Sequence, residues 1–331
     1  MSQAVSVEIP IIDVGVLIAA KPLDLAALAL VAAEVREACL NSGFFYITNH
    51  GISQELIDAA FEANRRIHQL SDAEKSAIKL NRWHRGYQLF ASSTLRSSRH
   101  FAPATHANQL ESFMIRHEVD PAAPDAMCGD LAGPNQWPQD PWFREVIGRF
   151  DAAVTELGHR MLKLLSMAVG EAPDWFDRFF APASTCLRLI HYPPAPQSRP
   201  EDLFGIHPHT DYGFLTLLAQ DGVGGLQVRR PDGTWIDAAP VPGSFVLNVG
   251  DALERWTNDR FRSTPHRVIN ASSERDRYSI AMFFDPHVDT EIVCLPRFVE
   301  EAGAAHVEPL RFGAYFASRL NANFPDRAGV S

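Results

Sequence analysis

HTDYGFLTLLAQDGVGGLQV, residues 209–228, contains two short apolar runs separated by a glycine-rich turn. Runs of this length, bounded by glycine and aspartate, are typical of β-strands joined by tight connections. Similar runs recur on both sides every eight to twelve residues. Regularly spaced short strands predict a double-sheet barrel or sandwich, with the jelly roll as the leading candidate. The expected strands are Cys186–Tyr192, Gly213–Ala219, Leu226–Arg230, Thr234–Ala238, Ser244–Val249, His266–Ala271 and Tyr278–Phe284.

The chain before this region has helical periodicity instead. Apolar residues recur at spacings of three and four over 23–41, 54–68 and 141–169, and Ser71 with Glu74 predicts a capping box. We therefore expect one α+β fold, with a double-stranded β-helix (jelly roll) core, a helical N-terminal region and a C-terminal helix. Further short strands are expected at Ile9–Val14, Phe44–Ile47 and Ser112–His117, and the last helix at Pro309–Asn321.

Composition argues against several other classes of protein. The 331 residues carry a formal net charge of −10, whereas a general nucleic-acid binder normally presents a basic face. The N-terminus has no basic region before its apolar run, and no window reaches the ~18 apolar residues of a membrane helix. Four cysteines without CxxC spacing suggest reduced thiols. We expect a cytoplasmic protein that binds neither nucleic acid nor membrane; its oligomeric state stays open.

The segment from His207 to Gly213 holds the densest group of potential metal ligands. Residues two apart on extended backbone face the same side, so His209 and Asp211 can converge on one ion. His266 follows a proline at the start of an expected strand and is the best third ligand. Two histidines and one carboxylate form the face of non-haem iron(II) oxygenases, whereas catalytic zinc needs a tetrahedral site. His207 is a competing ligand that we expect to be structural, and a chance His-x-Asp pair is the simpler alternative.

The segment from Arg277 to Phe283 alternates along the last expected strand. Arg277 and Ser279 share one face of it. An arginine that points into a barrel is costly unless a carboxylate meets it, and a guanidinium beside a hydroxyl forms a forked carboxylate site. A structural ion pair with Asp285 on the same face is the alternative. Beside a candidate iron face, an organic acid that Arg277 holds and the metal binds explains the pattern better.

Together these segments resemble the isopenicillin N synthase-like branch of the iron(II)/2-oxoglutarate-dependent dioxygenases. The resemblance covers roughly Ile9 to Phe316 and implies three parts: a helical leader region of the non-haem dioxygenase N-terminal type at 1–180, a jelly-roll oxygenase core at 181–300, and a C-terminal helix packed on the core at 301–331. The similar stretches are HTDYGFLTLLAQD, GGLQV, NVGDALERWTNDRFRSTPHRV and RYSIAMFFDP, and earlier in the chain IPIIDV, GFFYITNHGI, RGYQLF, ESFMI and GPNQWP.

The resemblance also implies how the site is occupied. Fe(II) would be bound by His209, Asp211 and His266, with no catalytic residue beyond this metal centre. The distal carboxylate of the cosubstrate 2-oxoglutarate would be held by Arg277 and Ser279, with a hydroxyl contact from Tyr192. One departure from the pattern weakens this expectation. Ile190 stands where the branch commonly has an asparagine, and isoleucine cannot hydrogen-bond the cosubstrate.

The implied activity is the oxidation by O2, most simply the hydroxylation, of a small organic molecule. It would be coupled to decarboxylation of 2-oxoglutarate to succinate and CO2. Basic residues between 85 and 116 favour an acidic or carboxylated substrate, with candidate contacts from Tyr87, Arg116, Phe214 and Phe283. Other readings stay open: a 2-oxoglutarate-independent oxidase resembling isopenicillin N synthase, an ethylene- and succinate-forming type, and a non-catalytic ligand-binding relative.

Overall fold

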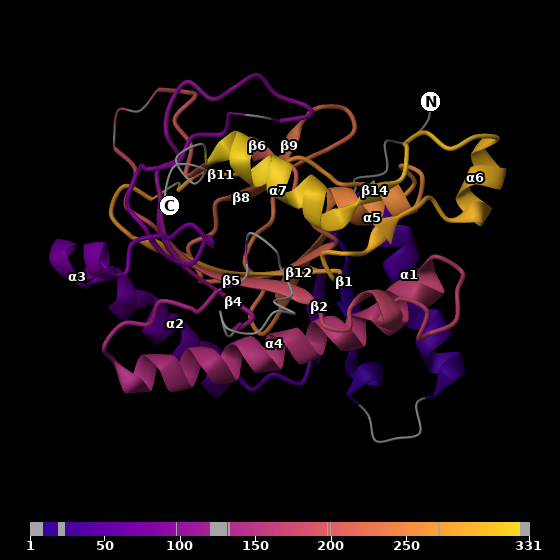
Figure 1. Ribbon diagram of the computed structural model, residues 1–331, viewed down its shortest axis with the longest axis horizontal. Helices are drawn as coiled ribbons and strands as arrows, with labels where there is room; N and C mark the ends of the chain where they lie inside the picture. The colour runs from indigo at the N-terminus through magenta and orange to yellow at the C-terminus, as the bar shows by residue number, and fades with distance from the viewer. Residues whose placement is uncertain are drawn as a thin grey trace.

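The computed structural model describes residues 9–18, 24–96, 98–119, 131, 133–196, 198, 200–270 and 272–324. Two β-sheets form its centre, and helices cover the outer side of the larger one (Figure 1). The strands of the larger sheet are Ile11–Asp13 (β1), Phe44–Thr48 (β2), Gly86–Gln88 (β3), Glu111–Arg116 (β4), Ser184–Tyr192 (β5), Leu215–Gln220 (β7), Phe245–Val249 (β10) and Arg277–Asp285 (β12). Those of the smaller sheet are Ile206–His209 (β6), Leu226–Arg229 (β8), Trp235–Asp237 (β9) and His266–Val268 (β11).

The strand order makes the barrel a double-stranded β-helix. The larger sheet runs β1-β2-β10-β7-β12-β5-β4-β3, and the smaller runs β6-β11-β8-β9. Neighbouring strands are antiparallel except for the parallel pair β1 and β2. This is the jelly roll that the regular strand spacing predicts.

Helix boundaries follow the capping signals in the sequence. The side chains of Asp24, Ser53 and Asp140 accept hydrogen bonds from backbone N–H groups in the first turns of three helices. The predicted capping box of Ser71 and Glu74 is present. The helices are Leu25–Asn41 (α1), Gln54–His68 (α2), Asp72–Ala77 (α3), Pro141–Ala168 (α4), Asp251–Trp256 (α5), Pro296–Ala302 (α6) and Phe312–Asn323 (α7).

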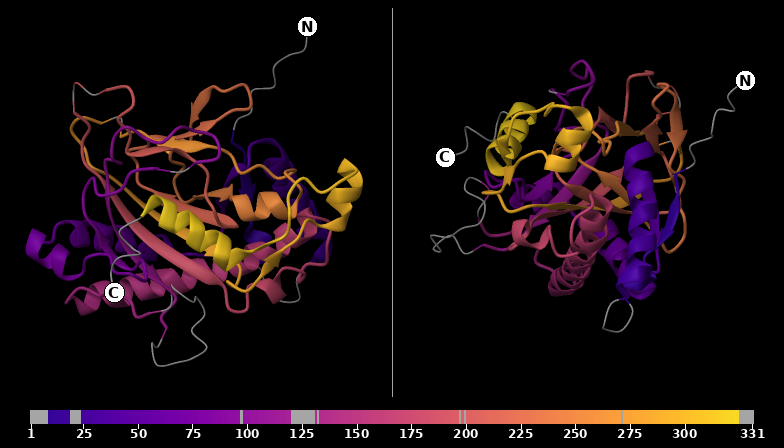
Figure 2. Two further views of the ribbon diagram at one scale, coloured as in Figure 1. Left: turned by 45° about the horizontal axis from the view of Figure 1, so that its top comes forward. Right: turned by 90° about the vertical axis from the view of Figure 1, so that its right-hand side faces the viewer.

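The helices lie on two opposite sides of the barrel. Helix α4 runs along the outer side of the larger sheet with α1 and α2 beside it, and α7 lies on the other side, near the smaller sheet (Figures 1 and 2). The N-terminal helical region is not a separate layer, because it contributes β1 to β4 to the larger sheet. The division of the chain at 180 and 300 stays a prediction.

Strand β12 shows how the alternation of side chains separates two cores. Ile280, Met282 and Phe284 join the large cluster between the sheet and the helices. Ala281 instead belongs to a second cluster inside the barrel. Because successive side chains point to opposite faces, the polar residues that share the face of Ala281 also point into the barrel. These are Arg277, Ser279 and Asp285.

Several elements differ from the sequence-based expectation, among them α5, α6, Glu291–Ile292 (β13) and Leu310–Arg311 (β14), which it did not include. Strand β6 was not predicted, because it is only four residues long and contains Pro208, which disfavours strand. Strand β3 was missed for the same reason of length, with three residues. The last helix begins at Phe312 rather than Pro309, because β14 pairs with β13.

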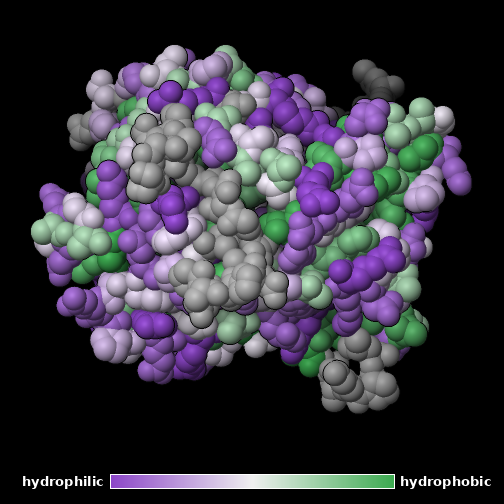
Figure 3. All heavy atoms as spheres, in the orientation of Figure 1, coloured by the Kyte–Doolittle hydropathy of each residue, from purple (hydrophilic) through white to green (hydrophobic). Residues whose placement is uncertain are grey.

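On the surface shown in Figure 3, hydrophilic and hydrophobic residues are interspersed. Within the described ranges, no helix has the length and apolar character that a membrane crossing requires. Cys39, Cys186 and Cys294 are free thiols, as expected from their spacing. Cys128 lies outside the described residues.

Candidate metal centre and adjoining cavity

His209, Asp211 and His266 meet where the smaller sheet pairs β6 with β11. His209 ends β6, His266 begins β11, and the two are direct partners in the antiparallel ladder. The Nε2 atom of each lies 3.7 Å from Oδ1 of Asp211. These separations are too long for hydrogen bonds but suit donors that each lie roughly 2.0–2.2 Å from a shared ion. The structure therefore brings together the three ligand atoms that the sequence predicts.

Hydrogen bonds at the second ring nitrogen orient both imidazoles. Nδ1 of His209 lies 2.8 Å from the carbonyl oxygen of His207, and Nδ1 of His266 lies 3.1 Å from that of Thr264. Because a carbonyl only accepts, each Nδ1 carries the hydrogen and each Nε2 keeps its lone pair. This is the tautomer that a metal ligand requires.

The carboxylate of Asp211 is held from the neighbouring sheet. Asp211 follows the end of β6, so strand geometry alone does not direct its side chain. The hydroxyl of Thr216 on β7 donates to Oδ2 at 2.5 Å, and Nδ2 of Asn248 on β10 donates to the same oxygen at 2.7 Å. Thr216 and Asn248 are register partners. Together they leave Oδ1 to face the two histidines.

Electrostatics keep His209 and Asp211 in the protonation states that bind a cation. Burial, with a smaller contribution from His266, lowers the pKa of His209 to about 4, so its imidazole is neutral at neutral pH. Burial alone would raise the pKa of Asp211, but the two imidazoles and the hydrogen bonds from Thr216 and Asn248 lower it overall. Two neutral histidines and one carboxylate suit a divalent ion.

His207, the competing ligand, lines the same cavity but is not part of this set of converging atoms. Its Nδ1 lies 2.8 Å from Oδ1 of Asn108, and its ring packs edge-on against Phe204. Its backbone N–H also donates to Asn108 Oδ1. The structure thus gives His207 a structural role in joining β6 to the loop before β4.

Arg277 lies deep in the barrel, with 1% of its surface exposed. Its Nη1 donates to the Ser279 hydroxyl at 3.4 Å, and its guanidinium carbon lies 4.6 Å from the ring centroid of Tyr192. Tyr192 is its register partner on β5. Its other donors reach the carbonyl oxygen of Gly224 at 2.5 Å and Oε1 of Gln220 at 3.1 Å. All these partners are neutral, so none of them compensates the positive charge of the guanidinium, which can bind a carboxylate.

The alternative of an ion pair between Arg277 and Asp285 is wrong. The two residues lie at opposite ends of β12. Oδ1 of Asp285 accepts a hydrogen bond from the backbone N–H of Phe214 at 2.7 Å. Burial raises the pKa of Asp285 to about 7 despite opposing effects of the Phe214 N–H and the charge of Arg116, and Arg277 is not among the groups that act on it.

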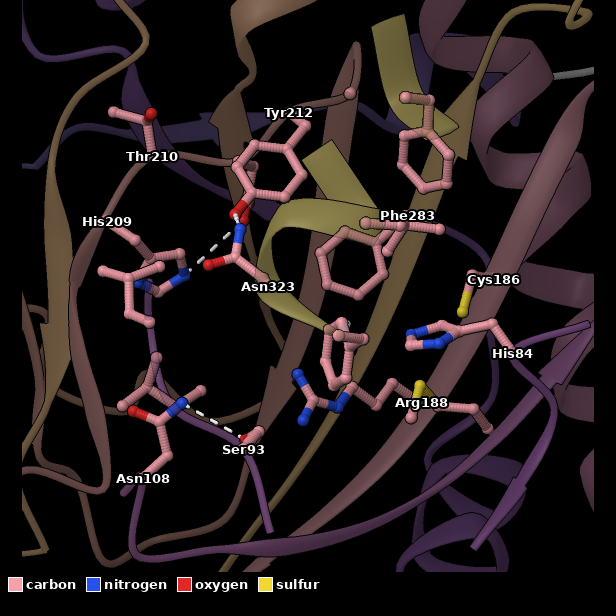
Figure 4. A pocket seen from close by; sticks show the side chains of 18 of the residues that line it. His84, Ser93, Asn108, Cys186, Arg188, His209, Thr210, Tyr212, Phe283 and Asn323 are labelled. Atoms are coloured by element: carbon pink, nitrogen blue, oxygen red, sulfur yellow. Dashed lines mark hydrogen bonds and ion pairs between the residues drawn. The ribbon is translucent and has the colours of Figure 1, made fainter. Parts of the chain in front are cut away.

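A cavity of about 160 Å³ adjoins the metal ligands (Figure 4). This is close to the ~150 Å³ of an engineered cavity that binds benzene, so it suits a small ligand. His209 and Asp211 line it, whereas Arg277, Ser279 and Tyr192 do not. Its wall is built from β4, β5 and β12, from the loop before β4, and from α7. These contribute Met114, Arg116, Cys186, Arg188, Phe283 and Asp285, then Ser93, Thr94, Leu95 and Asn108, and finally Phe316, Leu320 and Asn323.

Two predicted substrate contacts lie elsewhere. Tyr87 is on the face of β3 that points away from the barrel, and its hydroxyl lies 2.7 Å from Nδ1 of His68. The inward residue is its neighbour Gln88, because β-strand side chains alternate. Phe214 is fully buried in an aromatic cluster outside the barrel. It packs edge-on against Phe176, Phe180 and Trp256.

The other two predicted contacts, Arg116 and Phe283, do line the cavity. Of the other basic residues that favoured an acidic substrate, Arg85 and Arg99 have partners elsewhere, and Arg96 and His100 do not line the cavity. Nη1 of Arg85 donates to the carbonyl oxygen of His117 at 2.9 Å, and Arg99 pairs with Glu254 at 2.5 Å. Arg116 is therefore the member of that group with a place at the cavity.

Sequence reasoning missed Arg188, although the signal was present. Arg188 precedes Tyr192 by four residues on one strand, so both point to the same face of β5. It also missed Thr216 and Asn248, which reach Asp211 only because β7 and β10 pair in one register. Asn323 bridges two segments at the cavity, accepting from the Arg96 N–H and donating to the Tyr212 hydroxyl.

A second group of potential ligands, His68, Glu111 and His191, lies behind the larger sheet. Its atoms are already paired with one another and with a lysine. His191 Nδ1 lies 2.8 Å and Lys75 Nζ 3.1 Å from the carboxylate of Glu111. An ammonium beside the carboxylate supplies the positive charge that a metal would bring. We interpret this group as an ionic contact between α3, β4 and β5.

Comparison with known proteins agrees with the fold. Residues 183–286 match the 2OG-Fe(II) oxygenase superfamily, and residues 9–140 match the family described as non-haem dioxygenase in morphine synthesis N-terminal. The chain belongs to the 2OG-Fe(II) oxygenase superfamily. It is a non-haem dioxygenase that uses Fe(II), the cosubstrate 2-oxoglutarate and O2.

Individual relatives match most of the chain. A 2-oxoglutarate-Fe(II) type oxidoreductase, hxnY, of Emericella nidulans is 40% identical over 282 residues, which cover 82% of this chain and 79% of the relative. A homoarginine-6-hydroxylase of Arabidopsis thaliana is 32% identical over 332 residues, which cover 96% and 97%. The crystal structure of a full-length Neurospora crassa protein in complex with alpha-KG and thymine superposes with a TM-score of 0.82 at 28% identity, covering 95% and 96%.

Proposed function

We propose that His209, Asp211 and His266 bind the Fe(II), and that Arg277 with Ser279 and Tyr192 binds the distal carboxylate of 2-oxoglutarate. Two observations together carry this proposal. Two oriented imidazoles and one carboxylate converge on a common point and leave an open side. In the same barrel, a buried arginine has only neutral partners. A keto acid that binds metal at one end and arginine at the other accounts for both.

The chain's own residues position the reactants. Once bound, Fe(II) and 2-oxoglutarate supply the oxidising chemistry, in which O2 is consumed, succinate and CO2 are formed, and the substrate gains one oxygen atom. Arg277 fixes the far end of the cosubstrate, so its keto-acid end faces the metal. Ile190 lies opposite Ser279 in the β5–β12 register and is apolar and buried. Arg277 therefore has to provide the specificity that an asparagine at 190 would otherwise share.

The substrate is a small molecule that carries a carboxylate and is hydroxylated. Three observations support this class. The cavity is small, at about 160 Å³. Arg116 lies on its wall, and the relatives include a homoarginine-6-hydroxylase and a protein crystallised with thymine. Homoarginine, an amino acid, carries a carboxylate. A cytoplasmic location and the absence of nucleic-acid or membrane partners stay predictions from the sequence.

The test is a screen of small acids for succinate formation. The expected result is O2-dependent conversion of 2-oxoglutarate to equal amounts of succinate and CO2, stimulated by at least one acid that becomes hydroxylated. Ethylene is measured in the same vials, because the ethylene-forming alternative would release it without an added substrate. If 2-oxoglutarate were neither consumed nor able to protect the iron-loaded protein against thermal unfolding, an oxidase that uses another acid, or a non-catalytic relative, would replace this proposal.

A further inference from the structure

Arg188 points into the barrel from the middle of β5. Its Nε donates to the hydroxyl of Ser112 at 3.0 Å, and its Nη2 donates to Oε1 of Gln88 at 3.0 Å. Both partners are neutral, and no hydrogen bond from the remaining terminal nitrogen, Nη1, is made to the described residues. Burial lowers the pKa of Arg188, and the carboxylate of Asp211, which lies beyond ion-pair distance, acts in the opposite direction without reversing this. The side chain is thus fixed by two neutral groups and directs its charge at the cavity (Figure 4).

Arg116 lies beside Arg188 on the adjacent strand. Arg116 pairs with Cys186 in the β4–β5 ladder and Met114 pairs with Arg188, so the two arginines are diagonal neighbours on one face. Diagonal positions on an antiparallel pair are roughly 7–8 Å apart, within reach of long side chains. Both residues line the same cavity.

Arg116 is buried and has a hydrogen-bond donor without an acceptor among the described residues. Only 6% of the residue is exposed, and its Nε has no partner among the described residues. Its guanidinium carbon lies 5.5 Å from the ring centroid of Phe316. Asp285 also lines the cavity and feels the charge of Arg116, but the two are not within ion-pair distance, and Oδ1 of Asp285 is occupied by the Phe214 N–H. A buried guanidinium without a carboxylate is costly unless a ligand supplies one.

The two cavity arginines, Arg116 and Arg188, lie in a different part of the barrel from Arg277. Arg277 pairs with Tyr192, whereas Arg188 pairs with Ala281, four residues further along β12. At about 3.3 Å per residue this separates the two backbones by roughly 13 Å. Arg188 and Arg116 line the cavity, and Arg277 does not. One acid bound to Arg277 and the metal therefore leaves the cavity arginines without an anion.

We propose that Arg188 and Arg116 form an anion subsite that binds the carboxylate of the primary substrate and directs the rest of the molecule toward the metal. This inference rests on the proposed function, because it assumes that Arg277 is taken by 2-oxoglutarate. Phe283 and Leu320 supply apolar walls for the substrate body. Planar guanidinium groups bind carboxylates in bidentate fashion, so the subsite selects an acid over its neutral amide.

The experiment compares matched acids and amides. Probes are acetate and acetamide, benzoate and benzamide, and phenylpropionate and its amide. Each is titrated anaerobically into the holoenzyme with saturating Fe(II) and 2-oxoglutarate, and binding is followed by the change in the iron-to-cosubstrate charge-transfer band. The variants are Arg188→Met, Arg188→Lys and Arg116→Met, and the control is Arg149→Met, which removes an exposed arginine on α4.

At least one acid should bind the wild-type holoenzyme about tenfold or more tightly than its amide. Arg188→Met and Arg116→Met should each remove most of that preference while the dissociation constant of 2-oxoglutarate stays within about twofold. Arg188→Lys should keep an intermediate preference, because it retains the charge without the fork. Arg149→Met should behave as wild type.

Several results would overturn the subsite. One is that no acid binds more tightly than its amide. Another is that both methionine variants keep the preference for the acid. A third is that Arg188→Met weakens the binding of 2-oxoglutarate as strongly as the binding of the probe. Inorganic phosphate that competes better than every carboxylate would overturn the assignment of the anion. Failure of the proposed function looks different, because the wild-type protein would then give no charge-transfer band before any probe is added.

Discussion

The imidazoles of His209 and His266 lie with their ring centroids 4.3 Å apart, because their backbones are paired across β6 and β11. The metal face therefore depends on the register of the smaller sheet rather than on a single loop. Two imidazoles on paired strands are held more rigidly than side chains on flexible loops, whereas Asp211, in the loop after β6, depends on Thr216 and Asn248.

Removing the support of Asp211 should weaken iron binding without removing a ligand. Thr216→Val deletes a hydroxyl that donates to Oδ2 of Asp211 and keeps the shape of the side chain. Loss of such a supporting hydrogen bond typically costs 10- to 100-fold in metal affinity, and we expect a loss of about that size. Anaerobic competition with a chromogenic chelator measures it. Thr216→Ser is the matched control and should bind Fe(II) as wild type does; an unchanged affinity in Thr216→Val would show that the hydroxyl is dispensable.

Arg277→Ala should weaken 2-oxoglutarate and leave Fe(II) affinity nearly unchanged. Loss of a buried, charge-assisted contact costs about 2–5 kcal/mol, which corresponds to at least thirtyfold in the dissociation constant. Isothermal titration with 2-oxoglutarate in the presence of Mn(II) measures the change. Arg275→Ala, at an exposed arginine two residues away, is the control. Equal affinity for 2-oxoglutarate in wild type and Arg277→Ala would refute the role of Arg277.

Asp285 should make the metal-free protein less stable as the pH rises. Burial raises the pKa of this carboxyl from 3.8 to about 7, so the folded state holds a proton that the unfolded state releases above pH 3.8. Its contribution to stability is complete below pH 3.8 and is lost as the pH rises toward 7. Asp285→Asn keeps an acceptor for the Phe214 N–H but cannot ionise.

Urea unfolding at pH 5 and pH 8 tests this expectation. The unfolding free energy of Asp285→Asn minus that of wild type should be larger at pH 8 than at pH 5, by an amount on the order of 1–3 kcal/mol. A difference between variant and wild type that is the same at both pH values would mean that Asp285 does not titrate between them.

Asn323 should restrain the loop before β4 that lines the cavity. Its Oδ1 accepts from the Arg96 N–H at 2.8 Å, and its Nδ2 donates to the Tyr212 hydroxyl at 2.7 Å. Asn323→Ala should therefore speed limited trypsin cleavage after Arg96 by severalfold, because cleavage needs local opening. Ser318→Ala, at an exposed residue of the same helix, should not. Equal cleavage rates in the two variants would show that this contact does not hold the loop.

Sequence patterns were sufficient to predict the barrel, because it depends on local periodicity. Regular spacing predicted the strands of the jelly roll. The His-x-Asp pair with His266 predicted three side chains that the structure brings together, and their role as metal ligands stays a proposal. Capping residues such as Ser53 and Ser71 predicted helix starts to the residue. These signals act over a few residues and need no knowledge of the partner strand.

What sequence reasoning missed depends on pairing between distant strands. Asn248 reaches Asp211 only because β10 pairs with β7. Arg116 and Arg188 become neighbours only because β4 pairs with β5. The placement of Tyr87 and Phe214 away from the cavity has a related origin, because an aromatic residue near a strand can face either core and composition does not say which.

The most direct test of the central claim is an anaerobic titration of Fe(II) and 2-oxoglutarate into wild type and His266→Ala, followed by absorption spectroscopy. The wild-type protein should develop an iron-to-2-oxoglutarate charge-transfer band that saturates at one Fe(II) per chain, and His266→Ala should develop none at the same concentrations. A wild-type protein without the band, or a His266→Ala variant that saturates like wild type, would contradict the assignment of Fe(II) to His209, Asp211 and His266.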